Sequence, residues 1–415
     1  MQDNEKKPAL RFKGFTDPWE QRKLGDAFER VVRKNTNNES RLPLTISAQD
    51  GLVDQITYFN NRVASRDVSN YYLVYNGEFA YNKSTSDGYP FGAVKRLDWC
   101  EKGVLSTLYI VFALKHPEKD DSDFMTVFYD TDRWHRGVAE RAAEGARNHG
   151  LLNISADDFF DIDTTMPEDK VEQEKIGRLL KKLDTLITLH QRKYEKLVNI
   201  KKSMLDKMFP PNGASVPEIR FKGFTDPWEQ RKLGEIAVFS KGVGYSKNDL
   251  CEEGTPIILY GRLYTKYETC IFDVDTFVKE KAGGVYSKGG EVIVPASGET
   301  AEDISIASVV VKPGILLGGD LNIVSPTAEY DSAFLALTIS SGATHKYLSS
   351  LAQGKSVVHL HNADIQSVSA KFPTKREQEK IHLLFGKIDT LITLHQRKLE
   401  KLQNIKKSCL EKMFV

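Results

Sequence analysis

The stretch RFKGFTDPWEQRKLG runs from Arg11 to Gly25 and returns unchanged from Arg220 to Gly234. A second, longer block follows each copy of this motif. The two blocks, Glu172–Phe209 and Glu377–Phe414, agree at 29 of 38 positions, and both contain DTLITLHQRK. Between motif and block lie segments of nearly equal length whose sequences do not visibly align. The chain therefore consists of two half-units that share a frame and differ in content, which suits a protein that reads two different things at a fixed distance.

Composition indicates a soluble protein of two or three domains. The chain has 415 residues, of which 40% are apolar and 28% charged, and this length can bury more than one core. The longest apolar runs, such as Ile304–Val311, are shorter than the ~20 residues that a membrane-spanning helix needs. The chain opens without a charged-then-apolar leader, so we expect it in the cytoplasm. Its four cysteines are scattered, which is typical of reduced thiols and offers no metal site.

The net charge of +1 hides an uneven distribution. The two repeated blocks together carry +8, and the rest of the chain carries −7. The intervening segments are acidic: Asp26–Thr165 has 16 basic and 22 acidic residues, and Glu235–Phe372 has 11 and 16. This composition argues against a simple basic groove in either segment. If nucleic acid binds there, local surfaces must concentrate positive charge, or a partner must supply much of the phosphate contact.

Apolar residues recur every seven positions in both repeated blocks, which predicts two long helices paired as an antiparallel coiled coil. No proline interrupts either block, and a helix of ~38 residues is roughly 57 Å long. The alternative is a pair of amphipathic helices in an ordinary core, but helices in compact domains average only ~11–12 residues. The basic outer faces are either solvated or meet DNA phosphate or an acidic partner. We assign these residues to the coiled-coil core: Ile176, Leu183, Leu186, Leu197, Ile381, Ile388, Leu391 and Leu402.

The repeated motif itself brings Phe12, Phe15 and Trp19 close together, and Asp17-Pro18 favours a turn. We interpret the motif as a strap that packs its aromatic side chains against the helix pair and leads into each variable segment. This structural role is favoured over direct ligand contact.

Both variable segments have the composition of mixed α/β structure. We expect strands at Tyr71–Tyr75, Glu78–Tyr81, Val104–Phe112, Pro256–Leu259, Glu291–Val294 and Ser305–Val311. Turns that place polar groups beside aromatics are candidate DNA contacts, because Asn, Arg, Lys and Ser pair with base edges in the major groove. A turn of this composition can equally be only a turn. The candidate DNA-binding residues are Tyr81, Asn82, Lys83, Ser84, Lys95 and Arg96 in the first segment, and Tyr260, Arg262, Ser297, Glu299 and Thr300 in the second.

Motifs for catalysis were sought without success. The sequence has no GxSxG, HExxH, GxGxxG or complete phosphate-binding loop. His359 and His361 have no obvious third metal ligand. The sequence therefore predicts neither catalytic residues nor a metal site in this chain.

The two RFKGFTDPWEQRKLG motifs and the two EQEKI…DTLITLHQRK…NIKKS…KMF helices together closely resemble specificity subunits of type I restriction–modification enzymes. The resemblance covers essentially the whole chain and is most specific in the repeated elements. Tyr89–Arg96 and Ser297–Thr300 are similar to stretches of the target-recognition domains of such subunits.

The resemblance implies an α+β fold: two globular mixed α/β target-recognition domains joined by two long helices that form an antiparallel coiled coil, with a pseudo-two-fold internal repeat. The expected boundaries are the first motif at 1–25, recognition domain 1 at 26–166, a central spacer helix at 167–209, the crossover with the second motif at 210–234, recognition domain 2 at 235–372 and a C-terminal spacer helix at 373–415.

The resemblance also implies a function. Each domain of such a subunit reads one half of an asymmetric bipartite site on double-stranded DNA, and the helices set the gap. The chain would be non-catalytic and would recruit two modification subunits, which methylate adenine N6 with S-adenosylmethionine. Restriction subunits, which use ATP and Mg, would join for cleavage. Three alternatives stay open: a fused enzyme with its own chemistry, a coiled-coil scaffold with no nucleic-acid role, and an assembly that only methylates. The base sequence of the target cannot be deduced.

Overall fold

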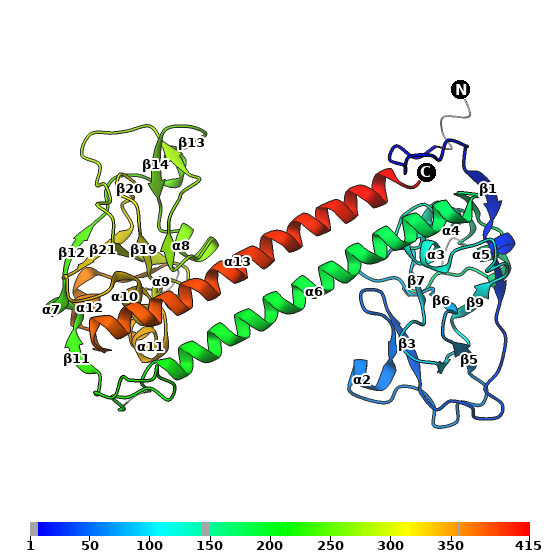
Figure 1. The fold of residues 1–415 in the computed structure, drawn as a ribbon, viewed down its shortest axis with the longest axis horizontal. Helices are drawn as coiled ribbons and strands as arrows, with labels where there is room; N and C mark the ends of the chain where they lie inside the picture. The colour runs from blue at the N-terminus through cyan, green and yellow to red at the C-terminus, as the bar shows by residue number, and fades with distance from the viewer. Residues whose placement is uncertain (1–6, 143–149, 212, 355–356) are drawn as a thin grey trace. The chain divides into compact units, whose positions relative to one another are not determined.

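The structure is a computed structural model, and it describes residues 7–142, 150–211, 213–354 and 357–415. The chain divides into two compact units. The first unit comprises Met1–Leu189 and Leu399–Val415, and the second comprises His190–Lys398. Figure 1 labels the elements of each unit. The mixed helix-and-strand architecture with two long helices confirms the predicted fold class.

The two long helices are α6 (Lys170–Met208, 39 residues) and α13 (Lys375–Lys412, 38 residues). Each contributes one part to each unit, and within the units they pack against each other. In the first unit Lys406 Nζ lies 2.6 Å from Asp184 Oδ1, and in the second unit Lys201 Nζ lies 2.5 Å from Asp389 Oδ1. Residue numbers rise along one helix as they fall along the other, so the pairing is antiparallel, as the repeat predicts.

The first unit is built on a four-stranded sheet in the order β2-β9-β6-β7, with three two-stranded sheets, β1-β10, β3-β4 and β5-β8, among the described residues. All these pairs are antiparallel. The strands are β1 (Glu20–Lys23), β2 (Phe28–Arg30), β3 (Leu44–Ser47), β4 (Gly51–Asp54), β5 (Tyr72–Tyr75), β6 (Phe79–Asn82), β7 (Ala93–Arg96), β8 (Lys102–Leu105), β9 (Ile110–Leu114) and β10 (Asp163–Met166). Its shorter helices are α1 (Leu24–Ala27), α2 (Gln55–Phe59), α3 (Ser122–Phe128), α4 (His135–Arg141) and α5 (Ala156–Phe160).

One strand expected from the sequence is wrong. Val104–Phe112 was expected to be continuous, but β8 ends at Leu105 and β9 begins at Ile110. The Tyr109 N–H donates to the Ser106 carbonyl and closes a tight turn between them. The two strands join different sheets, since β8 pairs with β5 and β9 pairs with β6.

The second unit is built on a five-stranded sheet, β12-β21-β17-β19-β15, and a four-stranded sheet, β13-β16-β14-β20, with two-stranded β11-β23 and β18-β22 among the described residues. The strands are β11 (Glu229–Lys232), β12 (Ala237–Lys241), β13 (Leu250–Cys251), β14 (Thr255–Ile258), β15 (Cys270–Ile271), β16 (Phe277–Val278), β17 (Glu291–Pro295), β18 (Ser297–Gly298), β19 (Ser308–Val310), β20 (Leu316–Leu317), β21 (Leu321–Pro326), β22 (Val358–His359) and β23 (Ser369–Phe372). The helices are α7 (Leu233–Ile236), the 3-10 turn η3 (Lys247–Asp249), α8 (Arg262–Thr265), α9 (Ala301–Ile304), α10 (Ser332–Ile339), α11 (Gly342–Leu351) and α12 (Asn362–Ser367).

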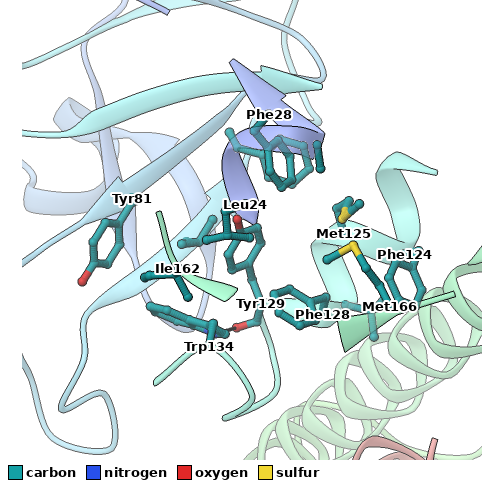
Figure 2. Close-up of a cluster of buried hydrophobic side chains, with 14 of the residues drawn as sticks. Leu24, Phe28, Tyr81, Phe124, Met125, Phe128, Tyr129, Trp134, Ile162 and Met166 are labelled. Atoms are coloured by element: carbon teal, nitrogen blue, oxygen red, sulfur yellow. Dashed lines mark hydrogen bonds between the residues drawn. The ribbon is translucent and has the colours of Figure 1, made fainter. Parts of the chain in front are cut away.

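Each unit has a main hydrophobic core in which its variable segment packs against both long helices. In the first unit the core joins aromatic residues of the variable segment to Ile176 and Leu180 of α6 and to Met413, which follows α13. Figure 2 shows part of this cluster, with Phe124, Phe128 and Tyr129 beside Leu24 and Met166. The second core likewise includes Met208 of α6 and Ile381 of α13. In each main core the variable segment therefore buries part of its apolar surface against the long helices.

Two features are absent from the described residues. No helix there has both the length and the apolar character required to cross a membrane. In the same part of the chain, no three side chains of the metal-binding types lie close enough together to hold an ion.

Candidate nucleic-acid interface

A buried ion pair fixes each copy of the repeated motif to the start of a long helix. In the first unit Arg11 donates from Nε and Nη2 to the two carboxylate oxygens of Glu172, at 2.6 and 2.7 Å. In the second unit Arg220 donates to Glu377 in the same way, at 2.7 and 2.8 Å. Both carboxylates are 1% exposed. These hydrogen bonds raise the pKa of each arginine above its ordinary value, and the planar two-point contact orients strap and helix.

The residue after each buried glutamate is a glutamine that ties the variable segment to the same helix end. Gln173 accepts from the Asp121 N–H at 2.8 Å, and Gln378 accepts from the Asp331 N–H at 2.9 Å. Asp121 and Asp331 each cap a helix, α3 and α10, by accepting from a backbone N–H three residues on. The two variable segments therefore share this attachment although their sequences differ.

The tryptophan of each repeated motif packs against the ends of the long helices, as predicted for the strap. Trp19 packs edge-on against Phe124 of α3 and against Phe414, which follows α13. Trp228 packs in the same way against Phe334 of α10 and against Phe209, which follows α6. The backbone repeats the pattern, since Leu10 donates to Lys412 and Ile219 donates to Lys207. Each frame therefore uses one strap, the start of one long helix and the end of the other.

The residues assigned to the coiled-coil core are not equally buried. Ile176, Leu183, Ile381 and Ile388 are buried, but they lie toward the helix starts, where the variable segments cover them. Half-buried positions are Leu186, Leu197 and Leu402. Leu391 is 43% exposed, so its assignment to the core is wrong. A heptad pattern identifies apolar positions but does not tell whether a helix partner, a globular segment or another protein covers them.

Apolar residues of the identical stretch DTLITLHQRK stay exposed in both units. On α13, Leu391 and Leu394 are each 43% exposed, and Leu189 at the equivalent position of α6 is 44% exposed. Residues three apart share a helix face, so Leu391 and Leu394 form one apolar pair, here called the α13 leucine pair. Leu186 and Leu189 form its counterpart, the α6 leucine pair. The same apolar surface is therefore present at repeated positions, once in each unit.

Among the predicted DNA contacts of the first segment, Tyr81 needs correction. Its side chain is completely buried on β6, stacks on Phe159 at 4.7 Å and donates its hydroxyl to the Phe91 carbonyl at 2.8 Å. Burial also raises the pKa of the phenol. Figure 2 shows the ring within the core cluster. Tyr81 is therefore a core residue and offers nothing to a DNA base.

Its neighbours Asn82, Lys83 and Ser84 shape a turn. The Asn82 side-chain oxygen accepts from the Ser84 N–H at 3.0 Å, and the Lys83 ammonium donates to the Ile154 carbonyl at 3.3 Å. Ser84 is exposed and bridges to Leu151 through the backbone. The turn lies at the surface, with two of its three predicted contact groups already engaged.

The predicted pair on β7 is also engaged within the unit. Lys95 lies 3.2 Å from Asp130. Arg96 donates to Asp98 at 2.6 Å and to Asp123 at 2.7 Å, and only 8% of its side chain is exposed. Because a guanidinium held by two carboxylates has little left to offer a base, we correct the assignment of Arg96 to a structural role.

In the second segment Arg262 requires the same correction. It donates to Glu268 at 2.7 Å and to Asp275 at 2.8 Å, and its side chain is 8% exposed. Tyr260 precedes α8, and its ring lies 6.1 Å from that of Tyr264. Arg262 therefore braces the α8 turn, and Tyr260 remains a surface candidate.

The other three predicted residues of this segment lie in one turn. Ser297 is on β18, Glu299 is exposed, and the Thr300 hydroxyl caps α9 by accepting from the Asp303 N–H at 3.1 Å. The charge of Glu299 contributes, after burial and Tyr260, to raising the pKa of Tyr264. Ser297, Glu299 and Thr300 therefore lie together in the turn between β18 and α9.

The fold places two histidines, His359 and His361, beside this turn, and neither was among the predicted DNA contacts. β18 pairs with β22, which places Ser297 opposite His359, with 3.2 Å between Ser297 Oγ and His359 Nδ1. The rings of His359 and His361 lie parallel, 6.5 Å apart, and both residues are exposed. His359 ends β22, and His361 lies two positions later at the start of α12.

The fold and its repeated frame define a class of protein: two different polar surfaces carried on one duplicated scaffold of strap and helix ends. Residues 225–404 match the family described as type I restriction modification DNA specificity domain. The resemblance predicted from the repeats is thereby confirmed, and residues 225–404 form a domain of this family.

Two relatives illustrate the match. The chain is 22% identical over 319 residues to the type I restriction enzyme MjaVIII specificity subunit of Methanocaldococcus jannaschii, covering 74% of this chain and 72% of that one. The crystal structure of a type I restriction-modification S subunit from M. genitalium covers 99% of both chains with a TM-score of 0.58 at 14% identity. The second comparison shows a shared fold.

Proposed function

We propose that each unit reads one half of an asymmetric, bipartite DNA site and that the chain itself performs no chemistry. The observation that carries this proposal is the repeated frame: the same ion pair, glutamine contact and tryptophan packing hold two segments of different sequence. Equivalent frames support two readers attached in the same way. Because the readers differ, the expected target is asymmetric, whereas identical readers would favour a palindrome.

The proposed partners are two modification subunits that methylate adenine N6. Two equivalent leucine pairs, one in each unit, support two copies of one partner. S-adenosylmethionine would belong to those subunits, and a target adenine would leave the duplex to reach their active site. Restriction subunits, with ATP and Mg, would join the same assembly. We place this assembly in the cytoplasm, and the four cysteines, all described and all free, agree with a reducing compartment.

The proposed gap between the half-sites is set by α6 and α13. Each is one uninterrupted helix that runs through both units, and a helix of 39 residues is about 58 Å long. One turn of B-DNA advances ~34–36 Å, which is within that length. Insertion of a few residues between Asp184 and Lys193 should alter the tolerated gap or abolish assembly. Unchanged spacing with full activity would refute the role of the helices.

The acidic variable segments fit a reader that leaves much of the phosphate contact to its partners. Such a chain binds DNA weakly alone and more tightly in the assembly. Titration of both across salt tests this, because the slope of affinity against salt reports the number of phosphates neutralised. Tight and steeply salt-dependent binding by the lone chain would contradict it.

The decisive experiment is methylome sequencing of a host that expresses this chain with its cognate modification subunit. Two dissimilar half-sites at a constant gap are expected. Replacement of residues 26–165 by the corresponding segment of another specificity subunit should change one half-site and leave the other half and the gap intact. A change in both halves would refute independent reading, and methylation by the purified chain alone would refute the non-catalytic role.

A further inference from the structure

The first unit carries an exposed surface that the predicted contacts do not include. This surface is the α2 segment, residues 55–66, which comprises α2 and the loop after it. Tyr58 and Phe59 are 48% and 50% exposed, with their rings 5.0 Å apart in an edge-on contact. The Asn60 and Asn61 side chains have no hydrogen-bond partner among the residues that the structure describes, and both residues are exposed.

Hydrogen bonds at both ends hold this segment in place. Asp54 caps α2 by accepting from the Ile56 N–H at 2.9 Å. The Gln55 side chain accepts from the Ala64 N–H at 2.6 Å and so closes the loop. Farther on, the Ser65 N–H donates to the Tyr71 hydroxyl at 3.2 Å. A surface held in this way loses little conformational freedom on binding, which favours recognition.

The charge of the segment opposes that of its surroundings. Residues 55–66 contain two arginines and no acidic residue, whereas Asp26–Thr165 as a whole has 22 acidic and 16 basic residues. Arg62 donates to the Ser65 carbonyl at 3.0 Å. Arg66 is exposed and forms no ion pair or hydrogen bond within the described part of the chain. Arg66 therefore offers an unengaged positive charge within the segment, while Asp54 and Asp67 flank the segment on its two sides.

We propose that the α2 segment is the reading element of the first unit and that it enters the major groove of DNA at an A·T pair. Asn60 stands at the end of α2 with φ of 50°, so its amide projects where the helix stops. An asparagine amide pairs with N6 and N7 of adenine, and an aromatic ring contacts the methyl group of thymine. Asn60 and Phe59 supply these groups, while Arg66 contacts phosphate. The inference rests on the proposed function and names the residues that perform it.

The protein offers a matched control for the key change. Asn60 and Asn38 are the two non-glycine residues with positive φ among those described, at 50° and 51°. Glycine adopts this conformation freely, so Asn60→Gly removes the amide and preserves the backbone. Asn38→Gly makes the same change at another exposed site of the same unit. Leu108→Ala, at a side chain 69% exposed, is the control for Phe59→Ala.

The test is selection from a pool of random DNA duplexes by the chain assembled with its cognate modification subunit. Asn60→Gly is expected to lose about 5- to 150-fold discrimination at one A·T position of one half-site, which is the range for a bidentate base contact. The other half-site should be selected as in the wild type. The Asn38→Gly variant should select the same DNA sequences as the wild type at both half-sites. Phe59→Ala should weaken DNA binding while the Leu108→Ala variant binds normally, and Arg66→Gln should reduce the salt slope by about one phosphate.

Two results would overturn the inference. If Asn60→Gly and Phe59→Ala both retain the wild-type profile and affinity, the α2 segment does not read DNA. If Phe59→Ala instead releases the modification subunit, the surface docks protein. In both cases a wild-type assembly that still selects two half-sites leaves the proposed function intact. A wild-type assembly that selects no sequence would refute the proposed function and this inference together.

Discussion

The leucine pairs make the stoichiometry of the assembly testable by mutation. Leu391→Ser with Leu394→Ser removes the α13 leucine pair and leaves the α6 leucine pair intact. Both side chains are already 43% exposed, so the free chain should keep its stability, since surface substitutions usually change it by less than about 0.5 kcal/mol.

The expected loss of affinity follows from the area that remains to be buried. Complete burial of a leucine is worth about 1.5–3 kcal/mol, so 43% of it is worth about 0.6–1.3 kcal/mol, or about 1.3–2.6 kcal/mol for the pair. This corresponds to a dissociation constant raised roughly 10- to 80-fold at one of two sites. At partner concentrations near the wild-type dissociation constant, the variant should bind one modification subunit where the wild type binds two.

Native mass spectrometry or sedimentation velocity measures this stoichiometry directly. Leu383→Ser is the control, because Leu383 is 55% exposed on the same helix but has a polar counterpart, Arg178, in the other block. Removal of the α6 leucine pair should give the same one-partner species, and removal of both pairs should give none. If the α13 variant binds two partners as tightly as Leu383→Ser does, the docking surfaces lie elsewhere.

Four further predictions concern the frame and the long helices. Gly177→Ala should destabilise the first unit by about 1–3 kcal/mol in urea unfolding, because an added Cβ would lie 2.6 Å from the backbone of α3. Gly386→Ala, with open space around its Cβ, should stabilise its helix by about 0.5–1 kcal/mol. Glu377→Gln should cost about 1–3 kcal/mol in urea unfolding, since the partly buried Arg220 loses its counter-charge and two hydrogen bonds to charged groups. An unchanged stability would contradict this. Burial, His395 and nearby lysines lower the pKa of His190 in the folded protein. As the pH falls below about 6.5, the unfolded state therefore binds the proton more readily than the folded state does. The free energy of unfolding should decline in this pH range. The melting temperature should fall less between pH 7.5 and pH 5.5 in the His395→Gln variant than in the wild type. An equal fall in both proteins would contradict the effect of His395 on His190.

The frame could be predicted from the sequence because its signals are local and occur twice. Seven-residue periodicity requires only neighbouring positions, and it located both long helices. The aromatic strap was likewise evident from Trp19 and its exact repeat at Trp228. The common attachment of the variable segments was not noticed, although DSDF at 121–124 and DSAF at 331–334 were legible in the sequence. A match at three of four positions, within segments that otherwise differ, does not stand out until Asp121 and Asp331 are seen capping equivalent helices.

The contact residues were harder to predict because a side chain's type does not reveal what already engages it. Arg96 is suited to pair with guanine, but Asp123, 27 positions away, accepts its hydrogen bond. Arg262 could also pair with guanine, but its guanidinium donates a hydrogen bond to Asp275 across a turn. Tyr81 was placed in a turn by its neighbours, although its strand buries it. Conversely, nothing in the sequence distinguishes Asn60 from other asparagines. Its positive φ and its lack of a hydrogen-bond partner are visible only in the structure.

The two buried ion pairs explain how one frame can accept unrelated contents. A buried pair contributes little net stability, because desolvation of both charges offsets much of their attraction. Its effect is on geometry, since a two-point contact tolerates neither a shift nor a rotation of the strap. Arg11 with Glu172 and Arg220 with Glu377 therefore fix where each variable segment leaves its helix, whatever sequence follows. The core packing supplies the stability, and it is drawn from both long helices in each unit. A segment can thus change its exposed residues, and with them the DNA that it reads, while the frame that positions it stays the same.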